Sequence, residues 1–328
     1  MTGSAFDFAC VLFPALAVDL VAGDPVWMPH PVRWIGRGAV FLEKILKPAG
    51  SPPFTEKLFG AVFALVIIGL AYAITAALLY LALIKSFFIF SAFSVYIIWT
   101  CLAIRSLGDG ARAVLSALNA DGPGGLDAAR KRLGRIVGRD TENLSKEAIL
   151  KASAETVAEN TSDAVVAPLF YLAIGGPALM MAYKAVNTLD SMVGYKNGKY
   201  IHFGWASARL DDAANFIPAR LTALLIVMAS FILSYNWRRA LRTVIRDAGK
   251  HPSPNSGWPE AAVAGALGIK FGGASTYGGV LSEKPFIGEA AAEITSGSAL
   301  STIKIMRSSA CIMAVATVII RKAVLLLL

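Results

Sequence analysis

Three carboxylates at intervals of four residues could do metal or acid–base chemistry. They are Glu155, Glu159 and Asp163, and on an α-helix this spacing places the side chains on one face. Like charges so spaced destabilise a bare helix. Two interpretations stay open: a solvated acidic face paired with bases such as Lys151, or a site for Mg²⁺, which would hold nucleotide phosphates through one or two of the carboxylates.

A second acidic pair, Asp211 and Asp212, stands at the edge of an apolar segment, with Arg209 before it and Arg220 after it. Ionised groups at such an edge are costly unless they bind a cation or pair with arginine. We therefore interpret this pair as binding a metal ion or orienting the two arginines.

A cation, an amide and a carboxylate share one predicted helical face, formed by Lys184, Asn187 and either Asp190 or Ser191. At membrane depth these groups need a polar partner, although an interfacial helix with a snorkelling lysine would also explain them. His202 follows in a basic, glycine-containing loop suited to a phosphate or carboxylate. A single histidine is more often structural than catalytic, so the acids rank above it.

Loops rich in proline and glycine carry further candidates, because irregular loops on rigid scaffolds often hold functional residues. Residues 272–279 form a small-residue loop that could bring backbone amides against a ligand, or could be a simple turn. The polar candidates in the loops 23–34 and 246–260 are Arg33, Lys250, Ser253, Asn255 and Ser256.

The elements that position these groups belong to a membrane protein. Only 16% of the 328 residues are charged and the mean hydropathy is +0.60, whereas soluble domains carry about 25% charged residues. A membrane-spanning helix needs about 20 apolar residues. The candidate segments are 6–21, 58–84, 87–104, 165–183, 216–233 and 312–328. The second and third predict a helical hairpin, and Gly175-Gly176-Pro177 breaks the fourth, which protein must then protect.

The fold class is therefore predicted as an all-α polytopic membrane protein, a helical bundle with broken or re-entrant helices and cytoplasmic layers of loops and helices. We expect a single integral membrane domain over 1–328, with a site formed by the polar stretches 23–57, 105–163, 184–215 and 235–305. Basic residues crowd 105–135 and 238–250, which places both in the cytoplasm and the chain in the cell membrane. If all six segments span the membrane, however, the stretch 184–215 lies on the side of the membrane opposite the cytoplasm. Either 165–183 and 216–233 are then incomplete spans, or the site lies at helix ends within the membrane.

The sequence argues against three other interpretations: nucleic-acid binding, a framework or metal site built from cysteines, and a cleaved signal peptide. The net charge of +9 comes from basic residues beside apolar segments, not interleaved with aromatics as nucleic-acid binding requires. The three cysteines lie far apart in apolar runs, which argues against a disulfide framework or a thiolate metal site. The apolar start lacks a basic region before it and a cleavage site after it, so we expect a retained segment and not a signal peptide.

Six different polar motifs follow one another along most of the chain, and their order matches that of a known protein family. They are Asp24-Pro25 through His30-Pro31-Val32-Arg33, Glu142-Asn143-Leu144-Ser145, Glu155-Thr156 through Asp163, Asn187-Thr188-Leu189-Asp190-Ser191 through Tyr195, Asp211-Asp212 through Pro218-Ala219-Arg220, and His251-Pro252-Ser253-Pro254-Asn255-Ser256-Gly257. Each is weak alone, but together they resemble the CobD/CbiB family, the adenosylcobinamide-phosphate synthases of cobalamin biosynthesis.

The resemblance implies a membrane ligase that joins adenosylcobyric acid to (R)-1-aminopropan-2-ol, or its O-phosphate, and forms an amide with consumption of ATP. Such a site must hold Mg²⁺, nucleotide phosphates, the corrinoid and the amine together. Other membrane enzymes of the pathway are candidate partners. The residues assigned to metal binding or general-base catalysis are Glu155, Glu159, Asp163, Asp211 and Asp212. Those assigned to substrate or phosphate binding are Arg33, Lys184, Asn187, Asp190, Ser191, His202, Arg209, Arg220, Lys250, Ser253, Asn255 and Ser256.

Two alternatives belong to other classes. An intramembrane prenyl- or alcohol-phosphotransferase would use acidic motifs on spanning helices to bind magnesium diphosphate, and Asn187 to Asp190 with Asp211-Asp212 could serve there. A transporter or sensor would use the broken helix near Gly175-Gly176-Pro177.

Overall fold

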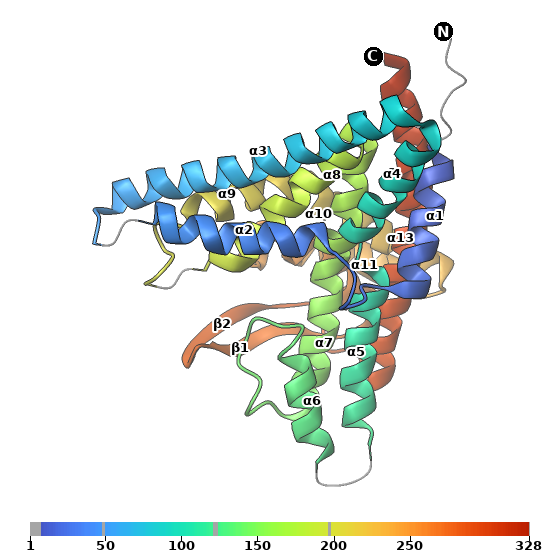
Figure 1. The fold of residues 1–328 in the computed structure, drawn as a ribbon. Coiled ribbons are helices and arrows are strands. Elements are labelled where there is room, and N and C mark those ends of the chain that lie inside the picture. Colours follow the sequence, from blue (N-terminus) through green and yellow to red (C-terminus); the bar gives the residue numbers. More distant parts are fainter. Residues whose placement is uncertain (1–7, 48–49, 121–123, 196–197, 328) are drawn as a thin grey trace. The chain divides into compact units, whose positions relative to one another are not determined.

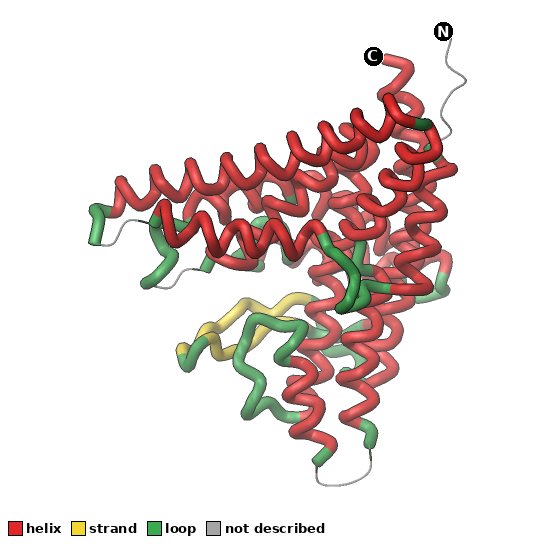
Figure 2. The backbone as a smooth tube through the Cα atoms, viewed as in Figure 1, coloured by secondary structure: helices red, strands yellow, loops and turns green. Residues whose placement is uncertain are grey.

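Helices make up most of the chain, as the computed structural model shows for residues 8–47, 50–120, 124–195 and 198–327 (Figures 1 and 2). The predicted all-α membrane fold is confirmed. The chain forms two compact units, and the single integral membrane domain over 1–328 stays a prediction. The first unit comprises Met1–Ala103, Ala167–Asn215 and Ala314–Leu328, and the second comprises Ile104–Val166 and Phe216–Met313. The predicted segment ends Phe6 and Leu328 lie outside the described residues.

The first unit is built from apolar helices. The predicted hairpin is present: Ser86 ends α3, and its Oγ accepts the N–H of Phe88 at 3.2 Å to cap α4, which packs against α3. Proline at the first position of α3 leaves no unpaired N–H there. The helices are α1 (Ala9–Ala22), α2 (Pro31–Leu46), α3 (Pro53–Lys85), α4 (Phe87–Cys101), α8 (Ala167–Val193) and α9 (Trp205–Ala214).

The predicted break in α8 lies at Gly176, whose φ is +72°. Pro177 follows and has no N–H to donate, so carbonyl groups in the preceding turn cannot all form their helical hydrogen bonds. Arg321, from the part of α13 (Ser296–Leu327) that belongs to this unit, donates from Nη1 to the carbonyl of Ile174 at 2.9 Å. Arg321 therefore supplies a donor from the protein itself to a carbonyl beside the break, which membrane depth would require.

The second unit packs helices around an alanine-rich core. Small side chains let helices approach closely: a Cβ on Gly265 of α12 would lie 2.7 Å from the Cα of Ala240 on α11. α5 and α7 also pack side by side (Figure 1). Besides the start of α13, the elements are α5 (Ile104–Leu118), α6 (Gly125–Leu133), α7 (Lys146–Thr161), the π-helix η1 (Ser162–Val166), α10 (Phe216–Ile232), α11 (Trp237–Asp247), the 3₁₀ turn η2 (Ala248–Lys250), α12 (Gly257–Leu267), β1 (Phe271–Tyr277) and β2 (Val280–Ile287).

The stretch 272–279, which the sequence suggested could be a loop that presents backbone amides to a ligand, is part of a two-stranded antiparallel hairpin (Figure 2). Gly278 and Gly279, with φ of +56° and +80°, form the turn between β1 and β2. Their N–H groups donate to the two carboxylate oxygens of Asp140 at 3.0 and 2.8 Å. These amides therefore bind the protein's own carboxylate.

Four helical runs are long and apolar enough to span a membrane. A fifth appears if α9 and α10, broken at Asn215, count together, so the predicted segment 216–233 does not qualify alone. α1, with 14 residues, is shorter than the roughly 20 that a span needs. The chain is thus a multi-pass membrane protein with irregular spans. The four runs are Pro53–Lys85, Phe87–Leu118, Lys146–Val193 and Ser296–Leu327.

Candidate functional site

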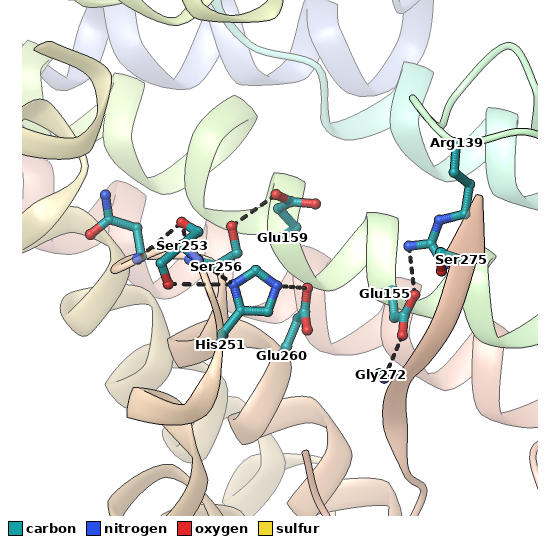
Figure 3. A network of polar contacts seen from close by, with 10 residues as sticks. Arg139, Glu155, Glu159, His251, Ser253, Ser256, Glu260, Gly272 and Ser275 are labelled. Atoms are coloured by element: carbon teal, nitrogen blue, oxygen red, sulfur yellow. Dashed lines mark hydrogen bonds and ion pairs between the residues drawn. The ribbon is translucent and has the colours of Figure 1, made fainter. Parts of the chain in front are cut away.

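Glu155 of α7 is bound on both carboxylate oxygens in the second unit. Arg139 forms an ion pair with Oε2 at 2.7 Å, and the N–H of Gly272 donates to Oε1 at 2.8 Å (Figure 3). Both charged side chains are nearly buried, with 12% and 6% of the arginine and glutamate exposed. Arg139 also donates to Oγ of Ser275 on β1 at 3.2 Å. These contacts attach the hairpin to α7, so they give Glu155 a structural role beside the catalytic one predicted for it.

Glu159, one turn further along α7, faces the proline-rich loop before α12. The hydroxyl of Ser256 donates to its Oε1 at 2.9 Å (Figure 3). Oγ of Ser253 accepts the N–H groups of Asn255 and Ser256 at 3.2 and 3.3 Å, which fixes the loop's conformation. Within the described part of the chain Glu159 forms no ion pair, unlike Glu155.

Arg220 of α10 extends this constellation. Its Nη1 donates to the Phe216 carbonyl at 2.6 Å and to Oδ1 of Asn255 at 3.4 Å. The guanidinium carbon lies 3.5 Å from the centre of the Phe216 ring and 4.5 Å from that of Trp258. Stacking between two aromatic rings suits the planar guanidinium and holds it in place. Among the described contacts only Nη1 is used, so the other donors of Arg220 could bind an anion.

His251 and Glu260 form a buried pair next to Glu159, and the sequence did not assign either to the site. Nε2 of His251 lies 3.9 Å from Oε1 of Glu260. Burial, and then the nearby Glu155 and Glu159, raise the pKa of Glu260 well above its usual range. Burial and Lys284 lower the pKa of His251. Both shifts favour the uncharged forms, a carboxylic acid beside a neutral imidazole. The N–H of Ser253 donates to Nδ1 at 3.0 Å, which places the ring proton on Nε2.

Negative charge around α7 is thus limited in two ways. Arg139 balances Glu155, and Glu260 favours its neutral form. No three His, Cys, Asp or Glu side chains in the described residues are grouped as a protein-only metal site would need. Magnesium that bridges nucleotide phosphates needs only one or two carboxylates, and Glu159 fits that requirement.

The first unit gathers a separate set of predicted residues. Nδ2 of Asn187 on α8 lies 3.5 Å from Oδ1 of Asp211 on α9. The backbone N–H of Asn215 donates to the carbonyl of Asp211 at 2.9 Å, and the hydroxyl of Tyr183 donates to Oδ1 of Asn215 at 2.8 Å. Asp190 lies within electrostatic range of Asp211. The predicted cluster of acids and amides on these two segments is therefore present as a spatial group.

Several other predicted residues of the first unit have local contacts. Arg33 donates to backbone carbonyls of residues 24–28, including that of Val26 at 2.9 Å, and so holds its own loop. Arg209 forms an exposed ion pair with Asp212 at 3.6 Å. Ser191 donates to the carbonyl of Asn187. His202 is half-buried and Lys184 lies on α8, near Cys101.

Two further predicted residues belong to the second unit. Lys250 pairs with Asp247 at 2.7 Å, next to the Arg246 ion pair with the same carboxylate. Asp163 falls in η1, beyond the end of α7, so the helical spacing that predicted one acidic face applies only to Glu155 and Glu159. Their functional assignments stay predictions.

Arg139, His251 and Glu260 are the residues that sequence reasoning missed. Arg139 lies in a polar stretch whose basic residues were interpreted only as a sign of a cytoplasmic location. Its pairing with Glu155 is visible only in the structure. His251 and Glu260 both border the proline-rich loop, and the density of polar residues there was the available signal.

The arrangement defines a multi-pass membrane protein with a polar site that contains a carboxylate, hydroxyls and a stacked arginine. A model of the CobD/Cbib protein family matches residues 12–306. A cobalamin biosynthesis protein CobD from Pelobacter propionicus is 46% identical over 318 residues, covering 93% of each chain, and one from Klebsiella pneumoniae is 47% identical over 292 residues, covering 89% of this chain and 91% of its own. The chain belongs to the CobD/Cbib family. No solved structure matches it.

Proposed function

We propose that this chain acts in cobalamin biosynthesis as an ATP-dependent ligase of the cell membrane. It would join adenosylcobyric acid to (R)-1-aminopropan-2-ol or its O-phosphate through an amide bond, at a site that opens to the cytoplasm. Family membership supports the pathway, and the names of the relatives support it too. Family membership also favours the ligase over the phosphotransferase and the transporter.

One observation carries the assignment of the site. Three motifs that are distant in sequence converge in the second unit: Glu159 bonds Ser256, whose loop also holds Asn255, and Asn255 bonds Arg220. A carboxylate that can bind Mg²⁺ or accept a proton and a guanidinium that can bind phosphate thus lie in one network with polar hydroxyl and amide groups, which suits ATP-dependent amide formation.

The residues then take distinct roles. ATP, when bound, would supply a phosphoryl group to the corrinoid carboxylate and leave as ADP; the amine nitrogen would then attack the acyl carbon and phosphate would leave as the amide forms. Arg220 is suited to bind phosphate oxygens, because a stacked, planar guanidinium is already ordered. Glu159 is suited to contact Mg²⁺ or to take the proton that the amine loses. The raised pKa of Glu260 limits the negative charge that would otherwise repel phosphate.

The test is turnover by purified protein. Wild type, incubated with adenosylcobyric acid, aminopropanol phosphate, ATP and magnesium, should produce a corrinoid whose mass rises by that of the amine less one water. Without any mass gain, with either the phosphorylated or the free amine, the proposed function is wrong.

Glu159→Gln tests the site itself. Glutamine retains the acceptor for Ser256 but has no negative charge, so folding should persist while turnover falls by at least 100-fold, the lower end of what a general base contributes. Glu283→Gln removes a carboxylate from the exposed strand β2 and should leave turnover unchanged. An active Glu159→Gln variant would exclude Glu159 from the reaction.

A further inference from the structure

A cavity of about 1150 Å³ lies within the second unit, and no role has been assigned to it above. Its walls come from the first turns of α7, the base of the β1–β2 hairpin, and the segment that leads into α13 (Figure 1). Ligand pockets for small molecules are typically about 300–1,000 Å³, so this one has room for a large ligand. Its alanines, Ala290 to Ala292, leave that space open.

Three lysines line the cavity: Lys146 and Lys151 on α7, and Lys270 just before β1. Two acids, Glu147 and Glu293, line it as well. Three cations from two separate parts of the chain suit a ligand with several negative charges. One or two carboxylates beside them are what Mg²⁺ bound to phosphates uses. The N-terminus of α7 adds a weak preference for anions.

An exposed aromatic ring adds a second kind of contact. Phe286 of β2 lines the cavity and is 54% exposed. Nζ of Lys270 lies 4.1 Å from the centre of its ring, so cation and ring support each other's position. An aromatic surface beside lysines matches a ligand that carries both a base and phosphates, because bases stack on aromatic side chains.

The cavity is connected to the candidate site through α7. Lys151 donates from Nζ to the carbonyl of Gly272 at 2.8 Å, and the N–H of the same glycine bonds Glu155. Eight residues separate Lys151 from Glu159 along α7, a rise of about 12 Å at 1.5 Å per residue.

We propose that this cavity is the nucleotide-binding site, with the base near Phe286 and the phosphates at Lys146, Lys151 and Lys270. The inference rests on the proposed function for its choice of nucleotide, ATP. It differs from that function because it assigns a location that the family motifs do not include.

Binding is measured directly, on the full chain in detergent, by titration with a fluorescent ATP analogue and then by competition with ATP and with tripolyphosphate. Lys146→Ala and Lys270→Ala should each weaken binding of both competitors at least tenfold. Phe286→Ala should weaken ATP at least fivefold and leave tripolyphosphate within twofold. Lys131→Ala, which removes an exposed lysine of α6 outside the cavity, is the matched control and should change neither.

Each outcome separates the inference from the function on which it rests. If wild type binds ATP and turns over, but the lysine variants bind as wild type does, the cavity is not the nucleotide site and the ligase function stands. If the variants weaken binding as expected while wild type fails to turn over the corrinoid, the site stands and the function is wrong. If wild type binds no nucleotide, the inference is wrong. Thermal unfolding of each variant within about 2 °C of wild type excludes misfolding as the cause.

Discussion

The ion pair between Arg139 and Glu155 gives the sharpest test of structural against catalytic roles in the candidate site. Arg139→Met removes the guanidinium and leaves a carboxylate that is only 6% exposed. Two unit charges about 4 Å apart interact by about 4 kcal/mol at an effective dielectric constant of 20. Breaking one partner of a buried pair costs about 3–5 kcal/mol in measured cases, and the lost bond to Ser275 is included in that range.

The size of the effect follows from the second unit. A loss of about 3–5 kcal/mol lowers the melting temperature by roughly 6–20 °C in a domain of 150–250 residues. Glu155→Gln alone should also destabilise, since it leaves Arg139 unpaired. In the double variant Arg139→Met/Glu155→Gln both charges are absent, and the glutamine Oε1 still accepts the Gly272 N–H. Its stability should return to within about 1 kcal/mol of wild type.

The assay is a double-mutant cycle read by both thermal unfolding and corrinoid turnover. If the contacts of Glu155 are purely structural, the double variant recovers stability and most of its activity. A double variant that is as unstable as Arg139→Met would refute the charge-pair reasoning. One that is stable but inactive would support the catalytic role predicted from the sequence.

Three further predictions concern stability. Because the pKa of Glu260 is raised, its ionisation destabilises the fold, so Glu260→Gln should raise the melting temperature relative to wild type at pH 8 and much less at pH 5. Arg246 lowers the pKa of Asp247, so the stability that this carboxylate contributes is present above about pH 4 and is lost progressively below it. The Asp247→Asn substitution should therefore cost roughly 2 kcal/mol of unfolding free energy. Unfolding measurements should show this penalty shrinking as the pH falls from 5 to 3. A Cβ on Gly60 would lie 1.9 Å from the Phe203 carbonyl oxygen, so Gly60→Ala should cost about 1–3 kcal/mol, whereas Gly69→Ala, with open space, should not.

The membrane segments were predictable because their signals are local. Apolar length identified α3, α4 and the long apolar helices, and the Gly-Gly-Pro break was placed within one residue of the kink at Gly176. The hairpin was missed because β1 contains two glycines and β2 contains a proline, residues that are depleted in strands. Gly278-Gly279, followed by Val280-Leu281, is a turn signal that could have found it, since two adjacent residues with positive φ suit the tight turn between antiparallel strands.

The site was predictable in composition but not in pairing. The spacing of Glu155 and Glu159 on one helix was correct, yet spacing cannot distinguish a carboxylate held by Arg139 from one that faces a serine loop. That difference depends on how the loop before α7, which carries Arg139, and the β1–β2 hairpin fold against α7. Asp163 shows a second limit, because the π-helix η1 changes the periodicity that the prediction assumed.

Two irregular features of the membrane segments compensate for each other. The break at Gly176 leaves backbone carbonyls without helical partners, and an unsatisfied carbonyl in the hydrocarbon region costs several kcal/mol. Arg321 interrupts an apolar helix, and a charge there is costly as well. Because Arg321 donates to the carbonyl of Ile174 beside the break, the guanidinium and this carbonyl each gain a polar partner. A sequence scan counts both as flaws in a span. The fold shows that they form one interaction, and loss of either partner would leave the other unpaired in an apolar setting.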